Sequence, residues 1–169
     1  MKEKPSAALC TVENSLVVFI DIQERLIAAI EGKSAASVVN NASRLLQAAH
    51  ALSVPVLFTE QSPGKLGNTH PTLLEARPPE SRMVEKTSFS ACEQDEFIRY
   101  LELSGRNEII ICGMETHVCV LQTTFDLLGR GYTVSVVEDA VCSRTTDNKN
   151  NEGIPNLHPS DGDFEQKLS

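Results

Sequence analysis

The sequence lacks the patterns that mark membrane, secreted and nucleic-acid-binding proteins. No stretch of its 169 residues approaches the roughly twenty apolar residues of a membrane span, and the first residues hold no apolar signal-peptide core. Asp and Glu (23) outnumber Lys and Arg (15), giving a net charge of -8 without the basic clusters that bind phosphate. We therefore expect a cytoplasmic protein with no membrane or nucleic-acid partner.

Metal and nucleotide motifs are missing as well. The five cysteines are an odd number with no CxxC pair, and the four histidines are scattered without an HExxH motif. This pattern favours free thiols in a reducing compartment and predicts no metal site. No GxGxxG or GxxxxGK[ST] loop occurs, so no nucleotide site is indicated, and a flavodoxin-like binder is disfavoured. We expect no cofactor.

The length and composition predict one globular domain. Hydrophobic residues make up 41% of the chain, an ordinary value, and 169 residues are too few for two ordinary domains. We assign the domain to residues 1–147, with 1–14 as a loose lead-in. Residues 148–169 are polar and rich in helix breakers, so we expect a tail that is disordered or lies on the surface.

Short apolar runs alternate with segments of helical periodicity. The expected strands cover 16–20, 54–59, 83–85, 109–112 and 133–137, and the expected helices cover 34–52, Ser90 or Cys92 to Gly105, and 119–128. Because each strand is apolar throughout, the pattern predicts a doubly wound, Rossmann-like α/β fold with a parallel sheet of five recognisable strands. The segment 60–81 reads as a long loop, either functional or simply solvated.

Three reactive side chains follow strand ends. Asp21, Lys86 and Cys119 each lie just past an expected strand, and the carboxyl ends of parallel strands share one edge of a sheet. Cys119 would stand in the first turn of a helix, where free N–H groups and the helix dipole favour a nucleophilic thiolate. The alternative is that Cys119 is a small buried hydrophobe.

Five segments carry a family resemblance. They are VVFIDIQERL (17–26), FTEQ (58–61), EKTSFSA (85–91), CGMETHVCVLQTTFDLLGRGYTV (112–134) and EDAVCSR (138–144). In this order and spacing, the chain resembles the isochorismatase-like cysteine hydrolases. Its motif residues are most similar to those of the small isochorismatase-domain hydrolases within that superfamily.

The resemblance implies a catalytic triad of Asp21, Lys86 and Cys119. Asp21 would act as general base, and Lys86 would keep it ionised and oriented while lowering the pKa of the thiol. Cys119 would attack a carbonyl carbon and form a thioester. A cis peptide between Met114 and Glu115 would turn the N–H groups of Glu115 and Cys119 towards the oxyanion. The expected substrate is a small amide, imide or related compound with a C–N bond.

Other positions are candidate substrate contacts. Gln23 would face the substrate or Asp21, or would begin a helix. Glu60 stands where nicotinamidases begin an Asp-x-His metal motif, here Glu60-Gln61-Ser62, so the resemblance also implies no metal. Phe89 would be a pocket wall or a core residue. Thr116 and His117 would shape the turn before Cys119 as well as border the substrate.

The end of the chain departs from the family pattern. Relatives continue into a further helix and a sixth strand, which the residues after 147 do not resemble. Without them the strand at 133–137 would be a bare edge, which favours association. We therefore expect a homo-oligomer. The alternative to an active hydrolase is a shortened, inactive or regulatory oligomerising member of the family.

Overall fold

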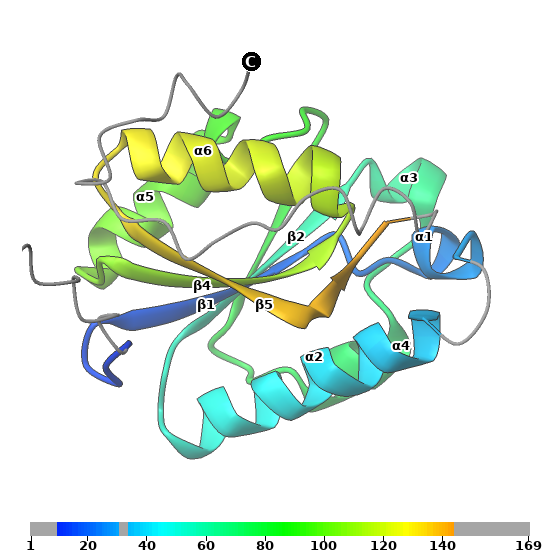
Figure 1. Cartoon of the computed structure of the whole chain (residues 1–169), viewed down its shortest axis with the longest axis horizontal. Helices are drawn as coiled ribbons and strands as arrows, with labels where there is room; N and C mark the ends of the chain where they lie inside the picture. The colour runs from blue at the N-terminus through cyan, green and yellow to red at the C-terminus, as the bar shows by residue number, and fades with distance from the viewer. Residues whose placement is uncertain (1–9, 31–33, 144–169) are drawn as a thin grey trace, which may run out of the picture.

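A twisted parallel sheet lies between two layers of helices (Figure 1). The computed structural model describes residues 10–30 and 34–143. The sheet has five strands in the order β3-β2-β1-β4-β5. They are β1 (Ser15–Ile20), β2 (Val56–Gln61), β3 (Arg82–Lys86), β4 (Glu108–Met114) and β5 (Thr133–Cys142). All neighbouring strands pair in parallel, which confirms the predicted doubly wound α/β fold.

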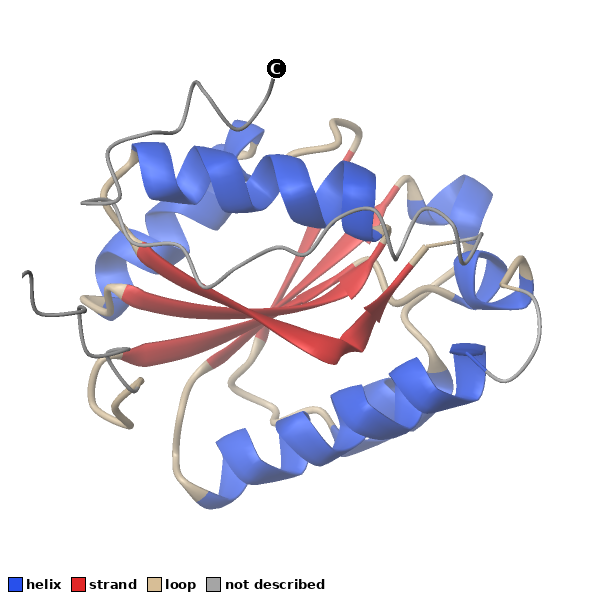
Figure 2. Cartoon of the chain, viewed as in Figure 1, coloured by secondary structure: helices blue, strands red, loops and turns tan. Residues whose placement is uncertain are grey.

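The central strand β1 is apolar throughout because both of its faces are covered. All six of its residues are buried. The face towards α5 (Asp95–Ser104) and α6 (Leu121–Gly129) contains Leu16, Val18 and Ile20 of β1. The opposite face, towards α2 (Ser34–Ala51) and α4 (Pro71–Ala76), contains Val17 and Phe19. Figure 2 shows these two helical layers on either side of the strands.

The segment 60–81 is more ordered than the sequence suggested. Strand β2 continues to Gln61, and two short helices follow, α3 (Pro63–Leu66) and α4. Each begins at a proline, which fits the first helical turn because its missing N–H has no partner there. The His70 side chain accepts a hydrogen bond from the Thr72 N–H at 3.3 Å and caps α4. The expectation of a single long loop was therefore wrong.

The end of β5 also differs from the prediction. Strand β5 continues for ten residues to Cys142, past the exposed Glu138 and Asp139, where the sequence indicated an end. Its pairing with β4 changes register between Ile111 and Gly113, which lets the strand resume beyond the polar pair. A one-turn helix, α1 (Glu24–Ala28), follows β1 with Gln23 at its N-cap, which confirms the alternative reading of Gln23 as the start of a helix.

The strand order reverses next to β1. From β1 the chain builds β2 and β3 on one side and then crosses to β4 and β5 on the other. Ligands of doubly wound sheets bind beyond the carboxyl ends of the strands at such a reversal. Within the described residues β5 forms one edge of the sheet, and the predicted tail 148–169 lies outside them. No helix in residues 10–30 and 34–143 has both the length and the apolar character needed to cross a membrane.

Candidate active site

A buried ion pair joins two strand ends across β2. Lys86, the last residue of β3, places its Nζ 2.7 Å from Oδ2 of Asp21, which follows β1, and both side chains have no exposed area. The Thr59 hydroxyl on β2 donates to Asp21 Oδ1 at 2.7 Å, and the Asp21 N–H donates to the Thr59 carbonyl at 3.2 Å. Asp21 has a φ of 48°, in the left-handed region. Side-chain and backbone contacts together fix the direction of its carboxylate.

The Lys86 ammonium is surrounded by oxygen atoms. Besides Asp21, it donates to Gln61 Oε1 at 2.7 Å, to the Ser88 carbonyl at 3.1 Å and to the Phe89 carbonyl at 3.0 Å. An unpaired buried charge costs several kcal/mol, and these four oxygens compensate it. Because the ammonium makes all of these contacts at once, the lysine is held in place and orients the Asp21 carboxylate.

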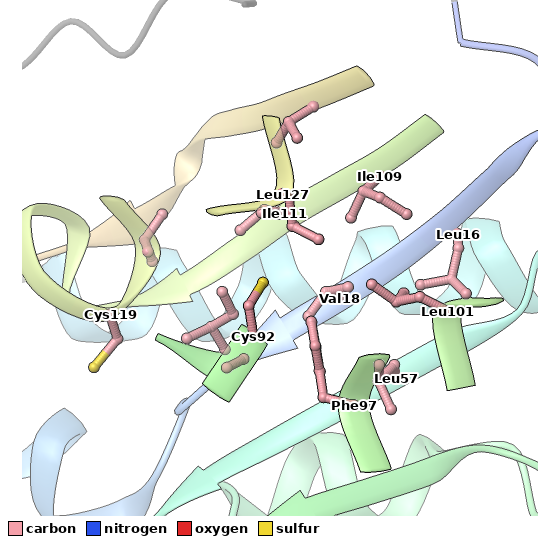
Figure 3. Packing of buried hydrophobic residues seen from close by; sticks show 14 of the residues in the cluster. Leu16, Val18, Leu57, Cys92, Phe97, Leu101, Ile109, Ile111, Cys119 and Leu127 are labelled. Carbon is pink, nitrogen blue, oxygen red and sulfur yellow. The ribbon is translucent and has the colours of Figure 1, made fainter. Parts of the chain in front are cut away.

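Cys119 lies next to this pair. It stands in a π-helical turn, Thr116–Val120, that follows β4 and leads directly into α6. Figure 3 shows the Cys119 sulfur at the edge of the apolar cluster, pointing away from the labelled side chains. The thiol interacts with the Asp21 carboxylate and with the Glu115 backbone N–H. The three side chains expected to form a triad are therefore brought together at one sheet edge.

The electrostatics of the thiol differ from the expectation of a stabilised thiolate. Burial, followed by the charge of Asp21 and a hydrogen bond to it, raises the pKa of Cys119 from 9.0 to a net value of about 12. Lys86 and the Glu115 N–H lower the pKa by less than these effects raise it. Lys86 thus lowers the pKa as predicted, but the prediction of a favoured thiolate was wrong: without substrate, the sulfur keeps its proton beside Asp21.

The end of β4 and the start of the elbow that leads to Cys119 contain two unusual backbone positions. The peptide bond between Met114 and Glu115 is cis, as the resemblance implied. Gly113 has a φ of 134°, and a Cβ there would lie 2.0 Å from the Ile20 carbonyl oxygen. A glycine is required because β1 and β4 approach so closely at this point. The close approach keeps the turn bearing Cys119 against the end of β1, where Asp21 follows.

The Gln23 side-chain amide makes a pair of hydrogen bonds with the Gln61 backbone that the sequence did not predict. The Gln23 side chain accepts from the Gln61 N–H at 2.7 Å and donates to the Gln61 carbonyl at 3.0 Å and the Gly67 carbonyl at 2.7 Å. The amide nitrogen and oxygen of Gln23 therefore both bind main-chain groups. Gln23 therefore holds the end of β2, from which Gln61 reaches Lys86, and it has no free N–H group for a substrate.

Glu60 and Phe89 also make contacts other than those expected. Glu60 is buried, and its Oε1 accepts from the Thr69 N–H at 2.6 Å and the Thr69 hydroxyl at 2.9 Å. It therefore ties β2 to the segment before α4. Phe89 is 55% exposed, so the alternative of a core residue was wrong, while its carbonyl holds Lys86.

Thr116 and His117 occupy the turn before Cys119. Thr116 is buried, and its hydroxyl oxygen has no hydrogen-bond partner within the described part of the chain. His117 Nδ1 lies 2.7 Å from the Ser143 hydroxyl, which links the elbow to the segment after β5. The His117 contact agrees with a turn-shaping role, and substrate binding by either residue stays a prediction.

Sequence reasoning missed Thr59 and Gln61, which contact the ion pair from β2. They are two residues apart on a strand, so their side chains point to the same face. Two polar residues at this spacing, at the carboxyl end of an otherwise apolar strand, could have indicated that their side chains contact the site. The Ser88 and Phe89 carbonyls left no such signal because main-chain oxygens are not specified by residue type.

A groove of about 480 Å³ borders Lys86 beyond the carboxyl ends of β2 and β3. Its walls are formed by 62–65 and 85–87, with Gln94 completing the lining. No three His, Cys, Asp or Glu side chains among residues 10–30 and 34–143 group in a way that could hold a metal ion. For the whole chain, the absence of a metal stays a prediction.

Comparison with known proteins finds a family that matches most of the chain. Residues 15–161 match the family described as Isochorismatase domain. Isochorismatase family protein 1B of Dictyostelium discoideum is 40% identical over 121 residues, covering 69% of this chain and 56% of that protein. Isochorismatase domain-containing protein 2 of Xenopus laevis is 38% identical over 134 residues, covering 79% of this chain and 63% of that protein.

A solved structure shares the fold at similar identity. The structure of MAR1 ribonuclease from Caenorhabditis elegans has a TM-score of 0.79 and 39% identity, covering 85% of this chain and 72% of that one. The chain spans less than two thirds of the length of the two relatives above, 56% and 63%. The family match covers most of the chain and includes Asp21, Lys86 and Cys119. The chain belongs to the isochorismatase family.

Proposed function

We propose that this chain hydrolyses a small carbonyl compound, an amide, imide or related C–N substrate, with Cys119 as nucleophile. The observation that carries the proposal is the buried ion pair of Asp21 and Lys86 at 2.7 Å, with the Cys119 thiol interacting with the same carboxylate. A thiol beside an oriented carboxylate and a fixed cation is the arrangement that nucleophilic catalysis needs.

The first half of the reaction forms a thioester. As the Cys119 sulfur attacks the carbonyl carbon, its proton passes to the Asp21 carboxylate and a tetrahedral oxyanion forms. Because the pKa of the buried thiol is raised to about 12, the proton leaves as the S–C bond forms rather than before the substrate binds. The C–N bond then breaks, the nitrogen takes the proton from Asp21, and the amine leaves.

The second half releases the acid. A water molecule attacks the thioester carbonyl while Asp21 accepts one of its protons, and the C–S bond breaks. The Cys119 sulfur then regains that proton, and the acid product leaves. Lys86 stays charged throughout and keeps the Asp21 carboxylate aimed at the sulfur, because three further oxygens hold its ammonium.

The backbone of the elbow would stabilise the oxyanion. The Glu115 N–H already interacts with the Cys119 sulfur, so it is directed towards the reacting atoms. Together with the Cys119 N–H it forms the donor pair that we assign to the oxyanion. Loss of one such donor lowers the rate of comparable enzymes about 100- to 1000-fold.

Ribonuclease activity is the competing possibility, because the Caenorhabditis elegans structure is named for it. The net charge of -8 weighs against it, since RNA binding draws most of its affinity from Lys and Arg contacts to phosphates. A homo-oligomeric state also stays a prediction, which light scattering of the purified protein would check. A cytoplasmic location stays a prediction as well, and imaging of the tagged protein would check it.

Turnover of a substrate panel tests the proposal. The panel contains p-nitrophenyl acetate, small amides, cyclic imides and an RNA oligonucleotide, each offered to the parent chain, Cys119→Ala and Cys112→Ala. Cys112 is a matched control because it is also buried, with 0% of its area exposed compared with 7% for Cys119, but lies in the opposite core cluster. We expect turnover of at least one carbonyl compound by the parent and Cys112→Ala and none by Cys119→Ala.

Three results would contradict the proposal. Equal turnover by the parent and Cys119→Ala would remove the nucleophile from the mechanism. Cleavage of RNA by the purified parent, lost in Cys119→Ala, would instead assign this site to the competing activity. An inactive but well-folded oligomer would support the alternative of a regulatory family member.

A further inference from the structure

We propose that Thr123 and Asp126 of α6 are positioning residues, which hold the turn 87–91 so that its carbonyls bind the Lys86 ammonium. This inference rests on the proposed function, because its consequence is the rate at which Cys119 is acylated. It links the helix that follows the nucleophile with the lysine that orients the base.

The turn after β3 supplies half of the oxygens around Lys86. The carbonyls of Ser88 and Phe89 lie 3.1 and 3.0 Å from its Nζ, and Asp21 and Gln61 supply the others. A backbone carbonyl can be aimed only by fixing the main chain that carries it. The correct position of Lys86 therefore depends on what holds this turn in place.

Helix α6 holds the turn through two side chains. Thr123 Oγ1 accepts a hydrogen bond from the Ala91 N–H at 3.0 Å, and Asp126 Oδ2 accepts from the Ser90 hydroxyl at 2.5 Å. Thr123 and Ser90 are buried, with 0% and 1% of their areas exposed. Thr123 and Asp126 are three residues apart and lie on one face of the helix.

Further hydrogen bonds within the turn pass this restraint to the carbonyls. The Ser90 hydroxyl also accepts from the Cys92 N–H at 3.2 Å, and the Ser88 hydroxyl donates to the Ser90 carbonyl at 3.0 Å. Gln94 donates to the Ser88 hydroxyl at 3.2 Å. The segment from Ser88 to Ala91 is thus bonded to itself and to α6.

The same helix also fixes the nucleophile. Helix α6 begins at Leu121, directly after the π-helical turn that contains Cys119. A shift of the turn relative to α6 would therefore move the Lys86 acceptors relative to the sulfur. Misplacement of catalytic groups by about 1 Å can lower a rate roughly 100-fold. Thr123 and Asp126 set this relative position without touching the reacting atoms.

The experiment measures acylation of Cys119 by p-nitrophenyl acetate in single turnover, together with steady-state kcat and KM. Thr123→Val keeps the shape of the side chain but removes the acceptor for the Ala91 N–H. We expect its acylation rate and kcat to fall about 10- to 100-fold with little change in KM. Thr123→Ser restores the hydroxyl and should recover most of the rate.

Thr124→Val is the matched control. Thr124 is buried in the same helix, but its hydroxyl donates to the Val120 carbonyl within that helical segment and not to the turn. We expect this variant to acylate Cys119 at close to the parent rate. Equal rates in Thr123→Val and Thr124→Val would overturn the inference, because loss of a buried hydroxyl would then explain both.

Asp126 provides a second, exposed position in case Thr123→Val does not fold. Asp126→Asn keeps an oxygen acceptor for Ser90 and should retain most of the rate, whereas Asp126→Leu should lower it. Equal rates in these two variants would contradict the inference. If Cys119→Ala or Lys86→Met acylates and turns over like the parent, the proposed function fails, whatever the Thr123 variants do.

Discussion

Replacement of Lys86 by methionine tests whether the ion pair supports the fold as well as the chemistry. Lys86→Met keeps most of the aliphatic volume but removes the ammonium from beside Asp21, Gln61 and the two turn carbonyls. Asp21 would then be a buried carboxylate without its cation. The Thr59 hydroxyl, at 2.7 Å from Oδ1, would remain as its side-chain donor on β2.

The magnitude follows from the burial of both partners. Breaking a buried ion pair by removing one partner costs about 3–5 kcal/mol, compared with about 5–15 kcal/mol for the whole free energy of unfolding. With a urea slope of about 2 kcal/mol per M, the unfolding midpoint should fall by roughly 2 M. Lys86→Met should therefore still fold in buffer, but with a much smaller free energy of unfolding than the parent.

A double-mutant cycle isolates the interaction. Urea unfolding is followed by circular dichroism for the parent, Lys86→Met, Asp21→Asn and the double variant. The double variant should lose less than the sum of the single losses, by about 1–3 kcal/mol, because neither side chain is left charged and unpaired. Losses that add to within about 0.5 kcal/mol would refute the claim that the two residues stabilise each other.

A surface ion pair gives the control. Arg82 and Glu96 are 4.0 Å apart, and their side chains are 62% and 57% exposed. Exposed pairs contribute about 0–1 kcal/mol, so Arg82→Met should change the unfolding midpoint little. A loss as large as that of Lys86→Met would mean that removal of any cation destabilises this acidic chain.

Three further predictions concern the same region. Gly113→Ala should lower the free energy of unfolding by about 2 kcal/mol or more, because its Cβ would lie 2.0 Å from the Ile20 carbonyl oxygen; a parent-like urea midpoint would contradict this. Burial raises the pKa of Cys119 from 9.0 to about 12, so the folded chain keeps a proton that the unfolded chain loses above about pH 9. The free energy of unfolding should therefore fall as pH rises from 9 to about 12, and less steeply in Cys119→Ala; identical slopes in urea titrations would count against the shift. Gln61→Leu removes one oxygen from Lys86 and should cost about 1–3 kcal/mol in urea unfolding and slow the acylation of Cys119; unchanged acylation would show that the remaining oxygens suffice.

The sequence predicted the parts of this fold that depend on residue type. Apolar runs identified β1, β2 and β4 most clearly, because these strands are largely buried on both faces, whereas β3 has the exposed Arg82 and Glu85 and gave a weaker signal. Asp21, Lys86 and Cys119 follow or end strands of one parallel sheet, so their proximity followed from topology. The ends of β2 and β5 were placed too early because polar residues such as Glu60 and Glu138 were read as the ends of strands.

The rest of the site depends on geometry that residue types do not encode. The pKa of Cys119 was expected to fall because a helix start and a lysine lower it, but the extent of burial and the nearby carboxylate raise it more. Gln23 was expected either to face the substrate or Asp21 or to begin a helix; it does precede α1, but its amide holds the Gln61 backbone, which neither reading included. The position of an amide side chain is set by which backbone groups need partners, and these are known only from the fold.

The central claim is that Cys119 carries the acyl group during turnover, and a pulse-chase measurement by intact-protein and peptide mass spectrometry tests it most directly. The parent chain is mixed briefly with p-nitrophenyl acetate, quenched in acid at successive times, and digested. We expect one acetyl group on the Cys119 peptide that forms and then decays at the rate of steady-state turnover, and that is absent in Cys119→Ala and reduced in Lys86→Met. Acetylation that accumulates on the exposed Cys10 instead, or an adduct on Cys119 that forms equally fast in Lys86→Met, would contradict the account.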